Sequence, residues 1–373
     1  MKRRLLALPF LACLLLALLL SGQPGSAKPL PRPPKGFFGI APQTELTELD
    51  ARYMKAGGIE SIRLPLLWSS VQPTRNGPYD WSGFDAMVEV AARAGLRVFP
   101  SLASPPRWVA RKETTLPVAN ARQRQAWSAF LSAAVARYGP RGEFWAQHGG
   151  IGVNYEPAIP IPVPIRQWQI WNEPNFFYFA YPVSPSQYGK LVTISSQAIK
   201  AVDPGAKVVL GGLFARPKAA GKRGMAAATF LQRLYAIPGM RSRFDGIDLH
   251  PYAIDSEELE EMTEEFHDVA LENRDRPWLY IGELGWGSQN NFQQVAFEQG
   301  IRGQVEQLRG SYGYMIENAR RLSLKAAYWF SWKDLAGSCT FCDSVGLFRA
   351  GAKFRPKPAW RAFVALTGGR ARP

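Results

Sequence analysis

The sequence predicts an α/β protein built as one parallel (β/α)8 barrel. Three observations lead to this fold class. Short β-branched or aromatic runs alternate along the chain with longer segments of helical periodicity. There are eight such runs. The length of 373 residues also exceeds the roughly 250 residues that one barrel needs. No short sequence repeat is visible, which argues against a solenoid, and a hydrophobic content of 46% is ample for one large core.

The eight candidate strands are short and bounded by turn residues. They lie at residues 37–40, 61–64, 98–101, 167–171, 207–210, 246–250, 278–281 and 327–331. Between them, segments 46–54 and 84–91 place apolar residues at helical spacing, and the second pattern stops near Gly95. Ser-Pro-Ser-Gln at 184–187 is typical of a helix start with Ser184 as N-cap, and Asp-Pro-Gly at 203–205 would end that helix.

Two segments interrupt the alternation of strands and helices. Residues 139–166 contain a Gly-Gly pair and several prolines, and predict an extended loop before the fourth strand. Residues 333–356 predict an insertion after the eighth strand. Loops on a rigid scaffold often carry function, so we expect both to lie near the rim of the barrel.

The first 27 residues have the pattern of a signal peptide. Basic residues at positions 2–4 precede an apolar run from 5 to 20, and small residues at 25–27 offer a cleavage site. This run is shorter than the roughly 18 residues of a spanning helix, which favours a cleaved signal over an uncleaved anchor. We therefore predict a secreted, extracellular protein, without stable membrane insertion once the signal is cleaved, and envelope-associated if it is kept. Residues 28–36 form a Pro-rich basic lead-in, and 37–373 form the barrel domain.

The chain is strongly basic, with a formal net charge of +15. A basic surface could favour an anionic glycan or a cell-envelope surface, although a generic surface bias explains it equally well. Lys and Arg are scattered and no nucleic-acid-binding motif is present, so we expect no nucleic-acid partner.

Cys339 and Cys342 form a Cys-x-x-Cys pair in the predicted insertion. Such a pair could be redox-active, metal-binding or a structural disulfide. Export favours the disulfide, and no second cysteine pair is available after the signal to complete a zinc site. We predict a bridge that tightens this loop.

Two glutamates each follow an apolar strand. Trp168-Gln-Ile-Trp-Asn172-Glu173-Pro ends the fourth strand, and Trp278-Leu-Tyr-Ile-Gly-Glu283-Leu-Gly ends the seventh. In a parallel barrel the carboxyl ends of the strands face the functional site. A pair of carboxylates there suits the cleavage of a glycosidic bond, in which one acid protonates the leaving oxygen and the other attacks the anomeric carbon or activates water. No metal or nucleotide motif accompanies the pair, so we predict no cofactor.

These two segments resemble those of glycoside hydrolase clan A, with families 5 and 39, the cellulase-like and β-xylosidase-like barrels, as the nearest relatives. The resemblance spans most of residues 37–366, although its specific motifs are short. It implies a retaining double displacement with Glu173 as acid/base and Glu283 as nucleophile, and Asn172 on the sugar 2-hydroxyl. The strand count places the two glutamates after strands four and seven independently of the resemblance.

Further positions match the clan one by one. Arg63 on the second strand resembles the arginine that supports the nucleophile and keeps it ionised. His250 and Tyr252 resemble the pair at the sixth strand. Trp329 and Trp332 match the region where a tryptophan forms the floor of the sugar subsite. Because strand residues alternate faces, only one of the two can do so, and we expect Trp332. Trp68 and Trp108 are weaker candidates for substrate binding, with core packing as the alternative.

The sequence departs from the clan pattern at one position, and several alternative functions stay open. Cellulase-like members carry a histidine after the third strand, and residues 99–106 contain none, which favours a family 39-like or an unassigned branch. A transglycosylase would use the same two glutamates, and a catalytically weak carbohydrate-binding protein could share the fold. We expect a carbohydrate partner, an oligo- or polysaccharide; the sequence does not distinguish endo from exo action.

Overall fold

The computed structural model describes residues 30–148, 159, 161–335, 337, 339, 341–351 and 353–373. The predicted signal segment 1–27 and the first two residues of the lead-in lie outside this part of the chain. Contacts divide the chain between residues 31 and 32, and the fold below is that of the unit Arg32–Pro373. No helix in the described part is long and apolar enough to cross a membrane.

The strands of the described part form one parallel sheet that closes on itself. They are β1 (Phe38–Ile40), β2 (Ser61–Leu67), β3 (Arg97–Ala103), β4 (Gln167–Ile170), β5 (Lys207–Leu210), β6 (Leu213–Phe214), β7 (Gly246–His250), β8 (Trp278–Leu284) and β9 (Leu324–Trp329). The first strand, β1, pairs with both β2 and β9, and β5 pairs with β7 through Val209 and Gly246. The two-residue β6 pairs with β7 outside this ring. The remaining eight strands make the closed barrel that the sequence predicts.

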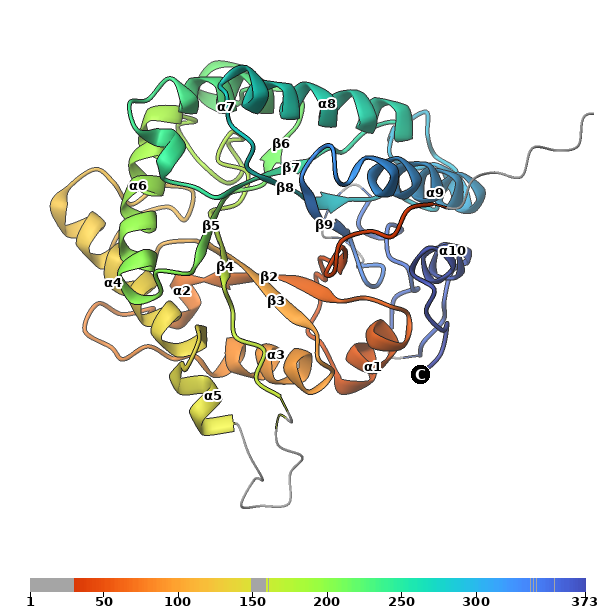
Figure 1. The fold of residues 1–373 in the computed structure, drawn as a ribbon, viewed down its shortest axis with the longest axis horizontal. Helices are drawn as coiled ribbons and strands as arrows, with labels where there is room; N and C mark the ends of the chain where they lie inside the picture. Colours follow the sequence, from red (N-terminus) through yellow and green to blue (C-terminus); the bar gives the residue numbers. More distant parts are fainter. Residues whose placement is uncertain are drawn as a thin grey trace, which may run out of the picture. The chain divides into compact units, whose positions relative to one another are not determined.

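Helices surround the barrel, as Figure 1 shows in a view that looks along it. They are α1 (Glu48–Ala56), α2 (Trp68–Val71), α3 (Ser82–Arg93), α4 (Ala121–Tyr138), α5 (Glu143–His148), α6 (Pro185–Val202), α7 (Ala227–Tyr235), α8 (Ser256–Glu272), α9 (Gly300–Asn318) and α10 (Pro358–Thr367). Short 3-10 helices lie at Gly221–Arg223 and Met240–Ser242.

Local sequence signals set several helix ends. Ser184 caps α6 by accepting a hydrogen bond from the Gln187 N–H, with Pro185 at the first helical position, as predicted. Thr47 and Asp50 form a reciprocal capping box at the start of α1. The helix predicted over 84–91 is α3, which ends two residues before Gly95.

Three strands extend further toward their carboxyl ends than the sequence pattern indicates. β2 and β8 run three residues beyond the predicted end and β3 runs two, so Glu283 lies within β8 and not after it. The eighth barrel strand, β9, begins and ends earlier than predicted. Inside the barrel, Phe99 stacks on Tyr280 and Tyr328 at ring-centre distances of 5.1 and 5.7 Å. This packed interior leaves the carboxyl end of the strands as the place for a site.

Candidate active site

Glu173 leaves the end of β4 on an unusual turn. Trp171 and Glu173 have φ angles of +74° and +40°, values that residues other than glycine seldom adopt. The Trp171 N–H donates to the Leu102 carbonyl at 2.9 Å, and the Glu173 N–H donates to the Gly212 carbonyl at 3.0 Å. Neighbouring strands therefore hold this turn in place. Strain that the surroundings maintain in this way is common at functional sites.

Glu283 projects from β8 toward Arg63 of β2. Arg63 Nη1 lies 2.6 Å from Glu283 Oε1, and Arg63 Nη2 donates to Asn172 Oδ1 at 2.7 Å. Arg63 Nε donates to Gln169 Oε1 at 2.8 Å. The structure thus brings together Arg63, Asn172 and Glu283, which the sequence could place only on separate strands.

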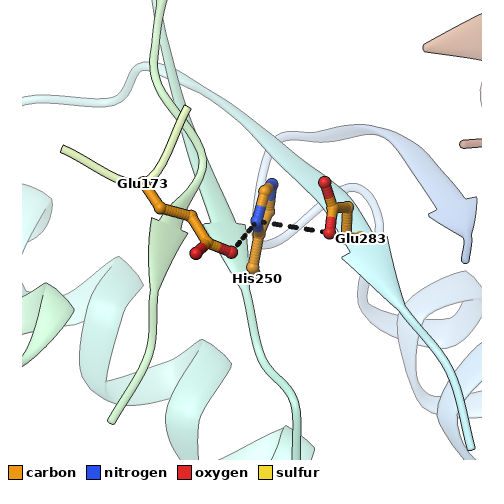
Figure 2. Close-up of side chains that lie close together, drawn as sticks. All are labelled: Glu173, His250 and Glu283. Carbon is orange, nitrogen blue, oxygen red and sulfur yellow. Dashed lines mark hydrogen bonds and ion pairs between the residues drawn. The ribbon is translucent and has the colours of Figure 1, made fainter. Parts of the chain in front are cut away.

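His250 lies between the two glutamates, as Figure 2 shows. Its Nδ1 is 2.8 Å from Glu173 Oε1 and 3.8 Å from Glu283 Oε2. The Tyr252 hydroxyl donates to Glu283 Oε2 at 2.7 Å. A methyl group on Gly212 would come within 1.9 Å of His250 Nε2, so this glycine leaves room for the imidazole.

The two carboxylates are close and lie in different electrostatic surroundings. One oxygen of each lies within 4.8 Å of the other and of a His250 ring nitrogen. Burial raises the pKa of Glu173, and the hydrogen bond with His250 only partly offsets this. Burial acts on Glu283 as well, but His250, Arg63 and Tyr252 together outweigh it and hold the pKa of Glu283 below its usual value.

Two polar residues that the sequence analysis missed lie behind Arg63 and Glu283. Gln169 donates to the carboxylate of Asp248, and the Gly282 N–H donates to Asp248 Oδ1 at 2.6 Å. Both side chains are fully buried. The available signal was a polar residue flanked by apolar residues in a strand, Gln169 between Trp168 and Ile170 in β4 and Asp248 between Ile247 and Leu249 in β7. Asp248 thereby fixes both the support of Arg63 and the backbone next to Glu283.

These groups open into a cavity of about 420 Å³ at the carboxyl end of the barrel. Its wall is predominantly apolar. Besides Arg63, Asn172, Glu173, Tyr252 and Glu283, the lining residues are Gln43, Pro65, Leu67, Ser101, Ala103, Ser104, Phe179, Phe214, Phe297, Phe330, Cys339, Phe341 and Cys342. The five phenylalanines were not predicted, because they come from five separate segments and carry no motif.

The four tryptophans considered for the site, of which Trp332 was the expected subsite floor, lie elsewhere. Trp332 is fully buried against Phe348 and Trp360, and its Nε1–H donates to Asp50 Oδ1 at 2.7 Å. Trp329 donates to the Val345 carbonyl and packs on Trp286.

Trp68 stacks on Phe130, and Trp108 donates to the Gln72 carbonyl. No tryptophan occurs among the described residues that line the cavity. The prediction that Trp332 forms the subsite floor is therefore wrong. Phe330, two residues earlier, lines the cavity instead.

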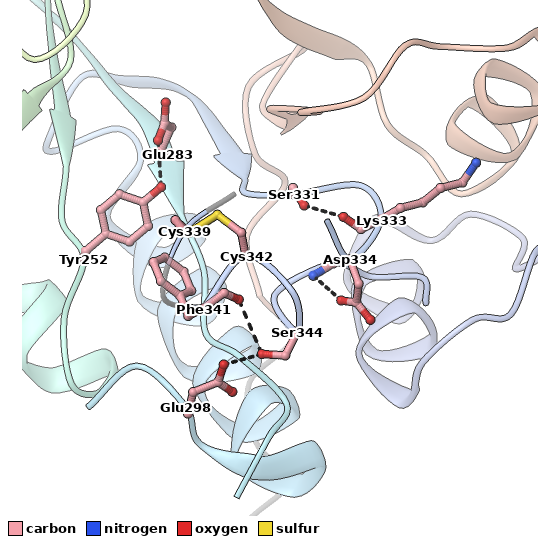
Figure 3. Close-up of a disulfide and its surroundings, with 11 residues drawn as sticks. Tyr252, Glu283, Glu298, Ser331, Lys333, Asp334, Cys339, Phe341, Cys342 and Ser344 are labelled. Carbon is pink, nitrogen blue, oxygen red and sulfur yellow. Dashed lines mark hydrogen bonds between the residues drawn. A yellow bond between two sulfur atoms is a disulfide. The ribbon is translucent and has the colours of Figure 1, made fainter. Parts of the chain in front are cut away.

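Cys339 and Cys342 form a disulfide, with their Cα atoms 5.0 Å apart. Figure 3 shows the bridge near Tyr252 and Glu283, with the ring of Phe341 next to that of Tyr252. The sequence favoured a structural disulfide over a redox-active or metal-binding pair, and the bond is present. Its place in the cavity wall was not foreseen.

Spacing alone would let Glu173, His250 and Glu283 hold a metal ion. However, Arg63 and the Tyr252 hydroxyl already contact the two oxygens of Glu283. A cation there would compete with the Arg63 guanidinium, so these donors fit a proton-transfer site better than a metal centre.

Solved structures of glycosidases share this fold. A family 39 glycoside hydrolase from Bacteroides cellulosilyticus WH2 matches with a TM-score of 0.64 and 17% identity, over 90% of this chain and 64% of its own. A monomeric β-xylosidase from Caulobacter crescentus CB15 matches with a TM-score of 0.61 and 18% identity, over 90% and 69%. The family 53 catalytic domain from Ignisphaera aggregans gives 0.60 and 18%, over 90% and 97%.

The chain resembles the TIM-barrel glycosidases of clan A. Residues 41–137 also match the model of a glycoside hydrolase family described as β-galactosidase, over about a quarter of the chain. Among curated proteins, inactive beta-amylase 9 of Arabidopsis thaliana is 39% identical over 49 residues, which are 13% of this chain and 9% of that protein. The chain thus spans less than two thirds of both the curated relative and the family 39 structure.

Proposed function

We propose that the protein is a retaining O-glycoside hydrolase with Glu173 as acid/base and Glu283 as nucleophile. The observation that carries the proposal is the pair of carboxylates in one cavity, within 4.8 Å and with pKa values shifted in opposite directions. Retaining enzymes keep their carboxyl groups about 5–5.5 Å apart, whereas inverting enzymes need roughly 6.5–9.5 Å to admit water between them. One oxygen of each carboxylate comes within 4.8 Å of the other, which is closer than inverting enzymes need, and this supports the retaining class.

The first step uses the two pKa shifts. Glu173, with its raised pKa, gives its proton to the leaving oxygen while the ionised Glu283 attacks the anomeric carbon. The bond from that carbon to the leaving oxygen breaks, and a covalent glycosyl–Glu283 ester forms. In the second step Glu173 takes a proton from water, the water oxygen bonds to the anomeric carbon, and the ester bond to Glu283 breaks.

Neighbouring residues have defined tasks in this scheme. Arg63 and Tyr252 stabilise Glu283 as an anion and hold its two oxygens in place. The amide oxygen of Asn172 accepts a hydrogen bond from Arg63, and Asn172 lines the cavity, so its amide nitrogen can donate to a sugar hydroxyl. His250 contacts Glu173 and limits its orientation.

The test is a panel of aryl glycosides of both anomers, assayed with wild type, Glu283→Ala and Glu173→Ala. Glu283→Ala should lose activity by orders of magnitude, because the covalent step is removed. Glu306→Gln, on the exposed face of α9, is the control that should remain active. Sodium azide should give a glycosyl azide of retained configuration with Glu173→Ala and of inverted configuration with Glu283→Ala. Activity that survives Glu283→Ala contradicts the assignment.

A further inference from the structure

The loop after Glu173 carries an unusual number of aromatic side chains. Residues 176–181 read Phe-Phe-Tyr-Phe-Ala-Tyr. Tyr178, Phe179 and Tyr181 are 65%, 41% and 45% exposed. Exposed apolar groups that cluster in this way commonly mark a binding surface. Phe179 also lines the cavity, so the cluster begins at its mouth.

Aromatic rings continue from this loop to the proposed nucleophile. Phe176 lies 5.2 Å from Phe214, and Phe214 lies 5.9 Å from Tyr252, measured between ring centres. Tyr252, whose hydroxyl contacts Glu283, lies 5.4 Å from Phe341. In Figure 3 the ring of Phe341 lies beside that of Tyr252. One apolar wall therefore runs from the exposed loop to the reacting groups.

The outer part of this wall belongs to the loop that follows Glu173, and Phe179 of that loop lines the same cavity as Glu173. Glu173 protonates the leaving oxygen in the proposed mechanism, so the departing group has to lie near Glu173. Phe179 follows Glu173 by six residues. The Phe214 N–H donates to the Asn175 side chain at 3.0 Å, which ties β6 to the same loop.

The charged side chains of the cavity are the two glutamates of the proposed mechanism and the arginine that contacts one of them. The charged residues among the described lining residues are Arg63, Glu173 and Glu283. Arg63 is already engaged by Glu283, Asn172 and Gln169. An aromatic ring can pack on the C–H face of a sugar, but the side chains of Phe179 and Phe214 offer its hydroxyl groups no hydrogen-bond partner, and burying hydroxyls without partners is unfavourable. An alkyl or aryl group packs on the same rings without this cost.

We propose that the substrate is a small glycoside with an apolar aglycone, an alkyl or aryl group that packs on Phe179 and Phe214. This inference rests on the proposed glycosidase function and specifies its leaving group. A cavity of about 420 Å³ lies within the usual size of small-molecule sites. The protein would accordingly release a hydrophobic alcohol or phenol and one sugar.

The experiment measures kcat/KM for n-alkyl glycosides from methyl to hexyl, with the sugar and anomer that the aryl panel identifies. Alkoxide leaving groups in this series have similar reactivity, so the slope with chain length reports binding of the aglycone. We expect kcat/KM to rise roughly three- to fourfold per methylene group until the wall is covered. Phe179→Ala should reduce the rise per methylene to below about twofold while the methyl glycoside changes little.

Phe292→Ala is the matched control, because Phe292 is 47% exposed and lies outside the cavity lining. It should leave the slope unchanged. Three results would overturn the inference without contradicting the glycosidase function. They are a kcat/KM that does not change with chain length, a slope that Phe179→Ala does not alter, and a disaccharide that is cleaved faster than the hexyl glycoside. If no glycoside of any kind is cleaved, the proposed function fails, and the aglycone inference fails with it.

Discussion

At the scale of single residues, the two glutamates show how one cavity supports two protonation states. Both are buried, so desolvation raises the pKa of each. What differs is the set of partners. Glu283 accepts hydrogen bonds from the guanidinium of Arg63 and the hydroxyl of Tyr252. Within the described part of the chain, the side chain of Glu173 hydrogen-bonds only with the imidazole of His250, which also lies near Glu283. With these partners the pKa of Glu173 is raised and that of Glu283 is lowered, which favours a proton on Glu173 and a charge on Glu283.

The activity should consequently follow a bell-shaped pH profile. kcat/KM falls as the pH drops through the pKa of Glu283, because a protonated nucleophile cannot attack, and falls as the pH rises through the pKa of Glu173, because the acid is lost. Tyr252→Phe removes a hydrogen bond to the ionised form of Glu283, so the acidic limb should move to higher pH. We also expect kcat/KM at the optimum to fall roughly tenfold or more.

The control for this profile is Tyr235→Phe, which removes a tyrosine–carboxylate hydrogen bond to Asp275 outside the cavity. It should leave both limbs in place. A shift of the alkaline limb alone in Tyr252→Phe would contradict the assignment of Glu283 as the ionised partner.

The contact between Gly282 and Asp248 permits a second prediction. A methyl group on Gly282 would lie 2.3 Å from Asp248 Oδ2, so Gly282→Ala must displace either Asp248 or the backbone that carries Glu283. We expect kcat to fall about a hundredfold, since small misplacements of reacting groups are costly. Gly313→Ala in α9, where an added methyl meets nothing within 4 Å, should keep full activity. Equal kinetics of the two variants would show that Asp248 does not position the nucleophile.

Residues with a motif could be predicted from the sequence, and those without one could not. Glu173 and Glu283 stand at the ends of apolar strands, so the strand pattern located them, whereas Arg63 was found through its resemblance to the second-strand arginine of the clan. The tryptophans were misassigned because size and aromaticity do not reveal on which side of the barrel wall a residue lies. Trp329 and Trp332 pack outward against helices and loops, whereas Phe330 faces the cavity.

At the scale of elements, the strands were predictable and the loops were not. Runs of apolar residues identified all eight barrel strands, because a parallel strand buried on both faces has a continuous apolar sequence. β6 has only two residues, too few for any periodic signal. The loop after β9 was recognised as an insertion, but its contact with Tyr252 depends on tertiary packing.

That loop carries a prediction of its own. The Cys339–Cys342 bridge encloses Phe341, whose ring packs on Tyr252 and on Phe297 at 5.4 Å each. In a Cys339→Ser/Cys342→Ser variant we expect KM for the hexyl glycoside to rise several-fold more than kcat falls, because the apolar wall loosens while the carboxylates stay in place. The free energy of unfolding should drop by about 2 kcal/mol at most, since the closed loop is short. A uniform loss of kcat with unchanged KM would instead place the bridge in the catalytic step.

At the scale of the whole barrel, closure joins segments that are distant in the sequence. β1 pairs with β9, and Asp50 of α1 contacts both Trp332 and Lys333, at 2.7 Å each. Trp332 in turn packs on Trp360 of α10. The barrel that presents Glu173 after β4 and Glu283 within β8 thus depends on contacts between its first and last elements. A sequence pattern can indicate such closure only through the number of strands.

Trp332→Phe separates this structural role from the substrate-binding role that the sequence suggested. The change removes the hydrogen bond to Asp50 and leaves space beside Phe348 and Trp360, which should lower the free energy of unfolding by about 2–3 kcal/mol. Urea unfolding measures this loss. kcat and KM should stay within about twofold of wild type, because the ring is fully buried away from the cavity. Phe330→Leu should behave in the opposite way, altering KM more than stability. If Trp332→Phe instead kept its stability and lost substrate affinity, Trp332 would form the subsite floor after all, and the apolar wall would have to extend across β9.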